Sequence, residues 1–435
     1  MKNINNELIE FIKHSATQFQ TVDTIETYLN NNKYNKLKEN ETWKLKSGKY
    51  YVTRNATSII AFDIPSKLED YHFQLCTSHT DSPTFKIKNV SELESNGYLK
   101  LNVELYGGAI LNTWLDKPLT IAGRVLVKNK NTCKSVNLYI DKDLFIIPNM
   151  PIHINNELNK GFQYNIQIDL CPLVSTNNLR KGDFVKYIAK YLNVKSENII
   201  SYDLYLVNRQ NPTILGFEDE FICAPRLDDL QASFCSLKGL LDSHTNKCIN
   251  VYACFDNEEV GSLTKQGASS TFLYDVLSRI NNCLKYSQED FYKAISKSFN
   301  ISFDNAHAIH PNHPEKYDAE NKCFINKGVV IKENASQSYT TDAFSRAIFN
   351  KVCDSAKVPY QSFANRSDSR GGSTLGNLSN NQVSMNTVDI GLAQLAMHSN
   401  FETAGCLDTE YGYKAIKEYY STNIIINETE SFSFK

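Results

Sequence analysis

The sequence has no C-x-x-C pair, although it contains 11 cysteines among its 435 residues. An odd number of cysteines without such pairs argues against a disulfide framework and against a cysteine-rich zinc site. We therefore expect reduced, mostly buried thiols and a cytoplasmic protein.

Long apolar runs and a strong excess of one charge are also missing. No stretch approaches the roughly 18 apolar residues that span a bilayer, and the formal net charge is only −2. Polar residues interrupt the amino-terminal segment MKNINNELIEFIKHSATQF, so it does not read as a signal peptide. Its Ile4, Leu8 and Phe11 instead follow the helical repeat. We expect neither a nucleic-acid partner nor a membrane partner.

The chain lacks internal repeats and Pro/Gly-rich linkers, yet its 435 residues exceed what one compact core usually holds. Several short apolar segments run into polar turns, and helical patterns lie between them. This alternation predicts an α/β sheet. The segments are FQLCTSHTD from Phe73, INVYACFDNEE from Ile249, FNISFDNAHA from Phe299 and VSMNTVDIG from Val383.

The middle of the chain has a different pattern. It contains short β-like runs, namely YLKLNVELYGG, LTIAGRVLV, SVNLYI and YNIQIDL, and one helical segment, GDFVKYIAKYLN. A β-rich block within an α/β chain predicts an inserted second domain. We expect one domain formed by residues 1–89 and 220–435, and an inserted β-rich domain formed by residues 90–219.

Five clusters of histidine and carboxylate residues follow the predicted strands or begin a helix. Each cluster alone would be ordinary, for example as a helix cap, but ligands bind beyond the carboxyl ends of strands in such sheets. Histidine and carboxylate without thiolate suit Zn²⁺, Co²⁺ or Mn²⁺. The candidates are His79 and Asp81 in SHTDSP, Asp228 and Asp229 in APRLDDL, Glu258 and Glu259 in DNEEVGS, Asp304 in FDNAHA, and His398 in AMHS.

In two of these motifs, neighbouring residues could take different roles at a metal site. In H-x-D, His79 can bind a metal through one ring nitrogen while Asp81 orients the ring. In E-E, Glu258 and Glu259 point in different directions, so one can bind metal while the other faces the reacting water. Two divalent cations would offset the negative charge that these clusters gather.

These motifs occur in one order with YGGAILNTWLDKPLTIAGRV, PIHINNELNKGFQYN, GVVIKEN, GGSTLGN and TVDIGLAQLAMHS…ETAG. Together they cover nearly the whole chain, and the sequence resembles the aspartyl aminopeptidase family of dinuclear zinc metallopeptidases. The resemblance implies a mixed-sheet zinc-peptidase catalytic domain with an inserted β-rich dimerisation domain. It also implies an aminopeptidase that removes N-terminal, acidic residues (Asp or Glu) from peptide substrates.

The resemblance implies two divalent metal ions per subunit, with zinc expected and cobalt or manganese as alternatives. Asp228 would bridge the two ions. His79 and Asp304 would complete one site. Glu259 and His398 would complete the other.

The remaining roles come from the same resemblance. Glu258 would be the general base for a metal-activated water, supported by Asp81. His153, in PIHIN, resembles a family histidine that enters a neighbouring subunit's active site. Lys332, in VVIKEN, resembles a family lysine that faces the substrate's first side chain. Dimers of the family assemble into a closed dodecamer, and we expect such a homo-oligomer here.

Some positions depart from the family pattern. Asp229 stands where the family usually has asparagine, His313 stands where tyrosine is frequent, and Asn400 and Phe401 replace an Ile-Arg pair. None of these changes removes an expected metal ligand. An additional acid beside the bridging residue and a lost arginine would weaken selection for acidic substrates.

Two other functions stay open at this point. One is a dinuclear deacylase of N-acyl amino acids, and the other is an inactive, metal-retaining assembly protein. An intact Glu258 argues against the second. His307 and His310 are expected to be hydrogen-bonded residues near the site or in a loop, and Tyr106 and Trp114 are expected in the core of the inserted domain.

Overall fold

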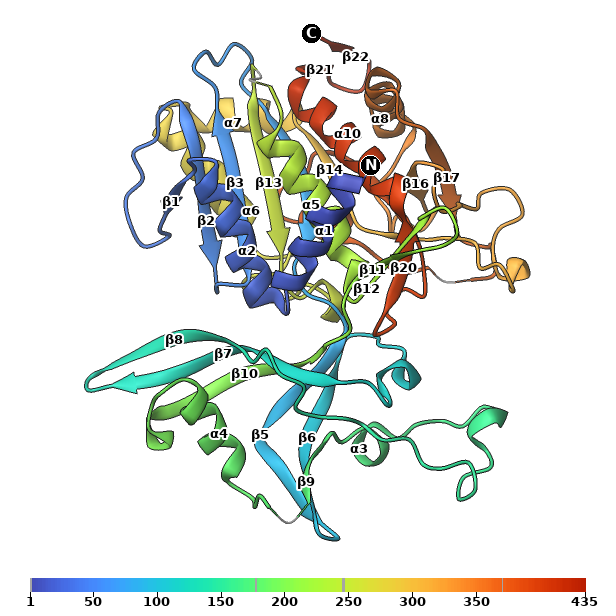
Figure 1. The fold of residues 1–435 in the computed structure, drawn as a ribbon. Helices are drawn as coiled ribbons and strands as arrows, with labels where there is room; N and C mark the ends of the chain where they lie inside the picture. The colour runs from blue at the N-terminus through green and yellow to red at the C-terminus, as the bar shows by residue number, and fades with distance from the viewer. Residues whose placement is uncertain (1, 177, 245–246, 370) are drawn as a thin grey trace.

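A computed structural model describes residues 2–176, 178–244, 247–369 and 371–435. They form two lobes (Figure 1): a large mixed sheet with helices on both faces, and below it in this view a six-stranded sheet. The predicted α/β class with a mixed sheet is confirmed. None of the helices in the described ranges combines the length and apolar character that a membrane span requires.

The large sheet has nine strands in the order β1-β2-β3-β13-β4-β14-β18-β16-β17. Its four central strands run parallel to one another. Three of them, β13, β4 and β14, are buried along their whole length, as parallel strands covered on both faces should be. The strands are β1 (Asn35–Leu37), β2 (Gly48–Arg54), β3 (Ser58–Ile64), β13 (Ile249–Phe255), β4 (Phe73–His79), β14 (Phe299–Phe303), β18 (Asn386–Gly391), β16 (Val329–Glu333) and β17 (Tyr360–Ala364).

Helices cover both faces of this sheet. One apolar core packs under α1 (Lys2–His14), α2 (Gln18–Asn31), α5 (Leu227–Leu241), α8 (Ala343–Ala356) and α10 (Cys406–Ser421). The core of the opposite face packs under α6 (Phe272–Cys283), α7 (Gln288–Ser296) and α9 (Leu375–Ser379). The buried apolar residues of α5 pack into the first core, and those of α6 pack into the second.

The six-stranded sheet is antiparallel, in the order β8-β7-β10-β5-β6-β9. Helix α4 (Asp183–Tyr191) buries Phe184 and Ile188 against it. Its strands are β5 (Thr84–Ser95), β6 (Tyr98–Tyr106), β7 (Leu119–Asn129), β8 (Thr132–Tyr139), β9 (Leu173–Thr176) and β10 (Ile199–Asn208). The expected boundary at residue 90 falls inside β5, and the division of the chain into two domains stays a prediction.

One expected strand is a helix instead. The segment YNIQIDL contains α3 (Ile166–Asp169). The Asn165 side chain accepts a hydrogen bond from the Gln167 N–H at 3.0 Å, and the Asp169 carboxylate accepts one from the Asn165 N–H at 2.7 Å. Alternating isoleucines over so few residues are compatible with either a strand or a helical turn. The side-chain caps stabilise the helical turn.

A five-stranded sheet lies between the two lobes (Figure 1) and has the order β11-β12-β20-β19-β15. Its strands are β11 (Thr213–Leu215), β12 (Phe221–Ala224), β20 (Glu402–Gly405), β19 (Ala393–Leu395) and β15 (Ala306–His307). A hairpin of β21 (Ile424–Asn427) and β22 (Ser431–Phe434) follows α10. The short 3₁₀ helices are η1 (Leu111–Trp114), η2 (Leu158–Lys160), η3 (Ser196–Asn198), η4 (Glu258–Val260) and η5 (Pro314–Lys316).

Candidate metal centre

The carboxyl ends of three parallel strands carry candidate ligands. Strand β4 ends at His79, β13 ends three residues before Glu258, and β14 ends one residue before Asp304. Parallel neighbours end at the same edge of a sheet, so these side chains approach one another. Asp228 joins them from the start of α5, and His398 joins them from the connection between β19 and β20.

Asp228 lies between two histidines. Its Oδ1 is 3.3 Å from His79 Nε2, and its Oδ2 is 3.6 Å from His398 Nε2. Asp304 Oδ1 lies 3.7 Å from the same nitrogen of His79, and Glu259 Oε2 lies 3.4 Å from that of His398. Two groups of ligand atoms share Asp228, one with His79, Asp229 and Asp304 and the other with Glu259 and His398. A third group joins His79 with Glu258 and Glu259, and within each group the atoms lie within 4.8 Å of one another.

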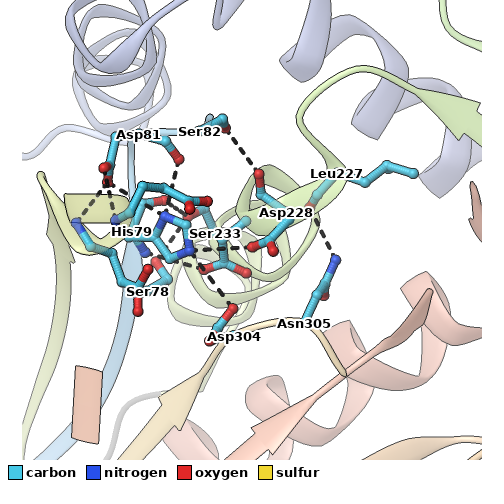
Figure 2. Close-up of polar contacts among 12 residues, drawn as sticks. Ser78, His79, Asp81, Ser82, Leu227, Asp228, Ser233, Asp304 and Asn305 are labelled. Carbon is cyan, nitrogen blue, oxygen red and sulfur yellow. Dashed lines mark hydrogen bonds and ion pairs between the residues drawn. The ribbon is translucent and has the colours of Figure 1, made fainter. Parts of the chain in front are cut away.

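Backbone carbonyls orient both histidine rings. His79 Nδ1 lies 3.0 Å from the Asp81 carbonyl oxygen, and His398 Nδ1 lies 3.1 Å from that of Gly108. A carbonyl oxygen only accepts, so each Nδ1 carries a proton and each Nε2 faces the Asp228 carboxylate. Nε2 becomes a metal ligand when it gives up its own proton. Figure 2 shows the His79 ring held between Asp81 and the carboxylates of Asp228 and Asp304. This is the arrangement that metal-binding histidines require.

The donor set fits a metal ion. Asp228 Oδ1, Asp229 Oδ1 and Glu259 Oε1 are buried and accept no hydrogen bond from any of the described residues. A buried carboxylate oxygen without a partner is costly. Divalent cations between the carboxylates and the imidazoles would satisfy these atoms, and a histidine and carboxylate set without thiolate suits zinc.

The electrostatics agree with this fit. Burial raises the pKa of the Glu258 carboxyl to about 8. Burial, with repulsion from Asp228, also holds the pKa of Glu259 well above its ordinary value. Burial disfavours the charged form of His398, but its hydrogen bond to Asp228 outweighs burial and raises the pKa of this ring to about 9. Acids that retain protons and imidazoles that gain them indicate a site that needs positive charge.

Asp81 anchors the turn that carries both glutamates. Its Oδ1 accepts the Glu258 N–H at 3.1 Å, and its Oδ2 accepts the Glu259 N–H at 3.2 Å. Oδ2 also accepts a hydrogen bond from the Tyr106 hydroxyl at 2.7 Å.

Tyr106 was expected in the core of the β-rich block, but it packs with Phe19 and Tyr205 and donates a hydrogen bond to Asp81 across the lobes. Trp114 does lie in that core.

A cleft of about 550 Å³ adjoins the cluster. Glu258, Lys332 and His307 line it. The Lys332 ammonium is buried and donates to the Asp304 carbonyl oxygen at 2.8 Å, with Asp304 Oδ2 at 3.4 Å. His307 and His310 do not belong to the groups of ligand atoms found in the described residues.

His153 lies apart from this cleft. It is exposed in a turn between β8 and α3. That segment extends away from the large sheet, toward the lower right of Figure 1. His153 is not among the residues that line the cleft of its own chain.

Glu402 is a buried residue of the site that the sequence reasoning did not single out. Its carboxylate accepts the N–H groups of Asp228 at 3.0 Å and of His398 at 2.7 Å. Glu402 could have been noticed in the sequence as the glutamate of the motif ETAG, four residues after His398.

Comparison with known proteins agrees with this geometry. The chain is 48% identical over 426 residues to "Probable M18 family aminopeptidase 2" of Clostridium novyi (strain NT), covering 96% of this chain and 98% of that protein. It is 36% identical over 459 residues to "Aspartyl aminopeptidase 4" of Saccharomyces cerevisiae, covering 95% of this chain and 94% of that protein.

Solved structures match over the same extent. The "Cryo-EM structure of the Ape4 and Nbr1 complex" superposes with a TM-score of 0.93 at 34% identity, covering 97% of this chain and 86% of that chain. The "Structure of S. cerevesiae mApe1 dodecamer" gives a TM-score of 0.84 at 27% identity, covering 95% of each chain.

The family match spans almost the whole chain. Residues 11–420 match the family described as "Aminopeptidase I zinc metalloprotease (M18)". The motifs that carried the resemblance lie within this range, and so do the two groups of ligand atoms around Asp228. The chain therefore belongs to the M18 family of zinc metalloaminopeptidases, which are hydrolases that act on peptides.

Proposed function

We propose that this aminopeptidase uses two divalent metal ions to remove N-terminal residues, with a preference for aspartate and glutamate. The main support for two metal ions is the position of Asp228. Its two carboxylate oxygens face two different imidazole nitrogens, at 3.3 Å and 3.6 Å. A carboxylate with this environment is suited to bridge two cations.

Two metal sites follow from this arrangement. His79 and Asp304 would complete the site on one side of Asp228, and Glu259 and His398 would complete the site on the other side. Zinc is the expected metal because the family is one of zinc metalloproteases, with cobalt and manganese as alternatives. When bound, such ions act as Lewis acids that polarise a carbonyl group and make water a stronger acid.

The chain's own residues would move the proton. Glu258 lines the cleft beside the cluster, and its pKa of about 8 without metal shows how little its environment favours the charged form. Nearby cations would favour its carboxylate, which could then take a proton from the attacking water and deliver it to the leaving amine. Asp81 fixes the backbone of this turn, so the carboxylate of Glu258 is held at the cleft.

The cleft supports a preference for an acidic first residue. Lys332 brings a buried ammonium to the wall of the cleft that contains Glu258. A buried ammonium at the wall of the cleft would attract the carboxylate of an aspartyl or glutamyl side chain. The name of the yeast relative, an aspartyl aminopeptidase, agrees with this assignment.

We also propose that the six-stranded sheet is a dimerisation domain. Met150, Ile152 and Ile154 expose apolar side chains on both sides of His153. Apolar exposure of this kind is typical of an interface. In a two-fold dimer each subunit would place His153 in its partner's cleft, where it could stabilise the tetrahedral oxyanion.

The similar mApe1 chain forms a dodecamer, and we propose a dodecamer here. A cytoplasmic location stays a prediction.

One experiment tests the catalytic proposal. Purified protein is stripped of metal, reconstituted with zinc, cobalt or manganese separately, and analysed for bound metal. Each form is then assayed on dipeptides that differ in the first residue, with free and with acetylated N-termini. We expect two equivalents of metal and cleavage only of free N-termini, fastest after aspartate or glutamate. Cleavage of the acetylated series would instead support a deacylase, and fewer than one equivalent of metal would contradict the dinuclear site.

A further inference from the structure

The five-stranded sheet aligns three segments that carry candidate ligands. Strand β12 leads into Asp228, the turn between β19 and β20 holds His398, and β15 follows Asp304. In this sheet Ala224 of β12 pairs with Glu402 of β20. Strand β19 pairs with both β20 and β15. The ligand segments therefore meet on one small sheet, although they are far apart in the sequence.

Glu402 connects two of these segments through their backbones. Its Oε2 accepts the Asp228 N–H at 3.0 Å, and its Oε1 accepts the His398 N–H at 2.7 Å. The side chain is 1% exposed. Hydrogen bonds from two backbone N–H groups to one buried carboxylate are among the stronger ones in proteins. The positions of Asp228 and His398 are thus tied to one side chain.

Gln394 and Asn305 extend the connection to the third segment. Gln394 Nε2 donates to Glu402 Oε1 at 3.4 Å, and Gln394 Oε1 accepts from Asn305 Nδ2 at 2.8 Å. Asn305 directly follows Asp304, and its amide also donates to the Leu227 carbonyl oxygen at 3.0 Å. Figure 2 shows this amide reaching the backbone just before Asp228. Gln394 and Asn305 are buried as well.

We infer that Glu402 is a positioning residue, which holds Asp228 and His398 at metal-binding distance before any metal arrives, with Gln394 and Asn305 connecting it to Asp304. The inference rests on the proposed dinuclear site. An ionised carboxylate suits this place because it only accepts hydrogen bonds and offers one oxygen to each N–H group. The glutamine amide has the same shape, but its NH₂ group would face one of the two N–H donors. Glu402→Gln therefore removes one bond with little change in volume.

Asp408 offers a matched control. It is a fully buried carboxylate that also accepts two backbone N–H groups, those of Asn326 at 2.6 Å and Gly328 at 3.0 Å. These partners precede β16 and carry no candidate ligand. Asp408→Asn thus removes an equivalent bond without touching the ligand segments.

The test compares the zinc dissociation constants of wild type, Glu402→Gln and Asp408→Asn by titration against a chromophoric chelator. Loss of a partner that orients a ligand costs about 10–100-fold in metal affinity, and we expect this loss for Glu402→Gln but not for Asp408→Asn. The visible spectrum of the cobalt-loaded protein should change only in Glu402→Gln. Equal affinities in all three proteins, or an equal loss in both variants, would overturn the inference.

A measurement on the unmodified protein keeps the test decisive if Glu402→Gln fails to fold. Hydrogen exchange of peptides that contain Asp228 and His398 is followed in the metal-free and zinc-loaded protein. A network that positions the ligands in advance protects both amides without metal. Protection that appears only with zinc would refute it. Wild-type protein that shows this protection but binds fewer than two metals would contradict the dinuclear proposal and leave the network standing.

Discussion

Removing the Tyr106 hydroxyl should loosen the turn that carries Glu258 and Glu259. This hydroxyl donates to Asp81 Oδ2 at 2.7 Å and accepts from Asn257 Nδ2 at 2.8 Å. Asp81 in turn accepts the N–H groups of both glutamates. Tyr106 ends strand β6 of the six-stranded sheet, whereas Asp81 follows β4 of the large sheet. Tyr106→Phe therefore cuts a polar connection between the two lobes directly behind the site.

The magnitude follows from the two bonds that are lost. A hydrogen bond to a charged acceptor contributes about 1.5–3 kcal/mol, and a buried donor left without its partner costs about 1–3 kcal/mol. Because the Asn257 amide can relax in part, we expect the free energy of unfolding to fall by roughly 2–4 kcal/mol. If about 1.4 kcal/mol of this energy serves to position Glu258, kcat should fall about tenfold.

The assay measures kcat, KM, bound metal and unfolding by denaturant for Tyr106→Phe beside Tyr202→Phe. Tyr202 provides the matched control because its hydroxyl donates to the carbonyl oxygens of Lys88 and Asn89, both at 3.3 Å, within the six-stranded sheet. We expect Tyr202→Phe to lose only about 0.5–1.5 kcal/mol and to keep the wild-type kcat. A Tyr106→Phe enzyme with unchanged kcat would refute the positioning role, even if its stability falls.

Four further predictions concern the site and the assembly. Glu258→Gln should retain its metal and lose roughly 10²–10⁴-fold in kcat, because the amide cannot accept the proton; a near-normal rate would place the base elsewhere. Because the pKa of His398 is raised to about 9 without metal, its ring is protonated below that pH, so metal binding should release protons and strengthen as pH rises. Calorimetry in two buffers of different ionisation enthalpy measures this release, and its absence would contradict the assignment of His398. Lys332→Met should lower the ratio of kcat/KM for acidic over neutral first residues by roughly tenfold or more, and an unchanged ratio would remove Lys332 from selectivity. Mixing Glu258→Gln chains with His153→Ala chains should restore part of the rate through hybrid sites; no rescue despite proven subunit exchange would refute the shared site.

The main elements of the fold and the composition of the cluster were predictable from local patterns. Strands β4, β13 and β14 are apolar runs that end in polar turns, and these patterns depend only on neighbouring residues. Parallel strands end at a common edge, so His79 and Asp304 could be expected to meet. The structure brings them within 3.7 Å of each other.

Short segments with two compatible patterns were not predictable in this way. The alternating isoleucines of YNIQIDL fit a strand, yet the caps at Asn165 and Asp169 make the segment helical. The pattern is too short to choose between these two structures.

The sequence alone determined which residue types could bind metal and at which strand ends they lie, because these features follow from periodicity and from motifs a few residues long. Only the tertiary structure decided how they are held. Glu402 bonds to Asp228, which is 174 residues away in the chain, and Tyr106 bonds to Asp81 from another sheet. A hydrogen bond between a side chain and a distant backbone group imposes no repeat on the sequence around either partner. Such contacts exist only once the strands have paired, and they therefore become visible only in the folded chain.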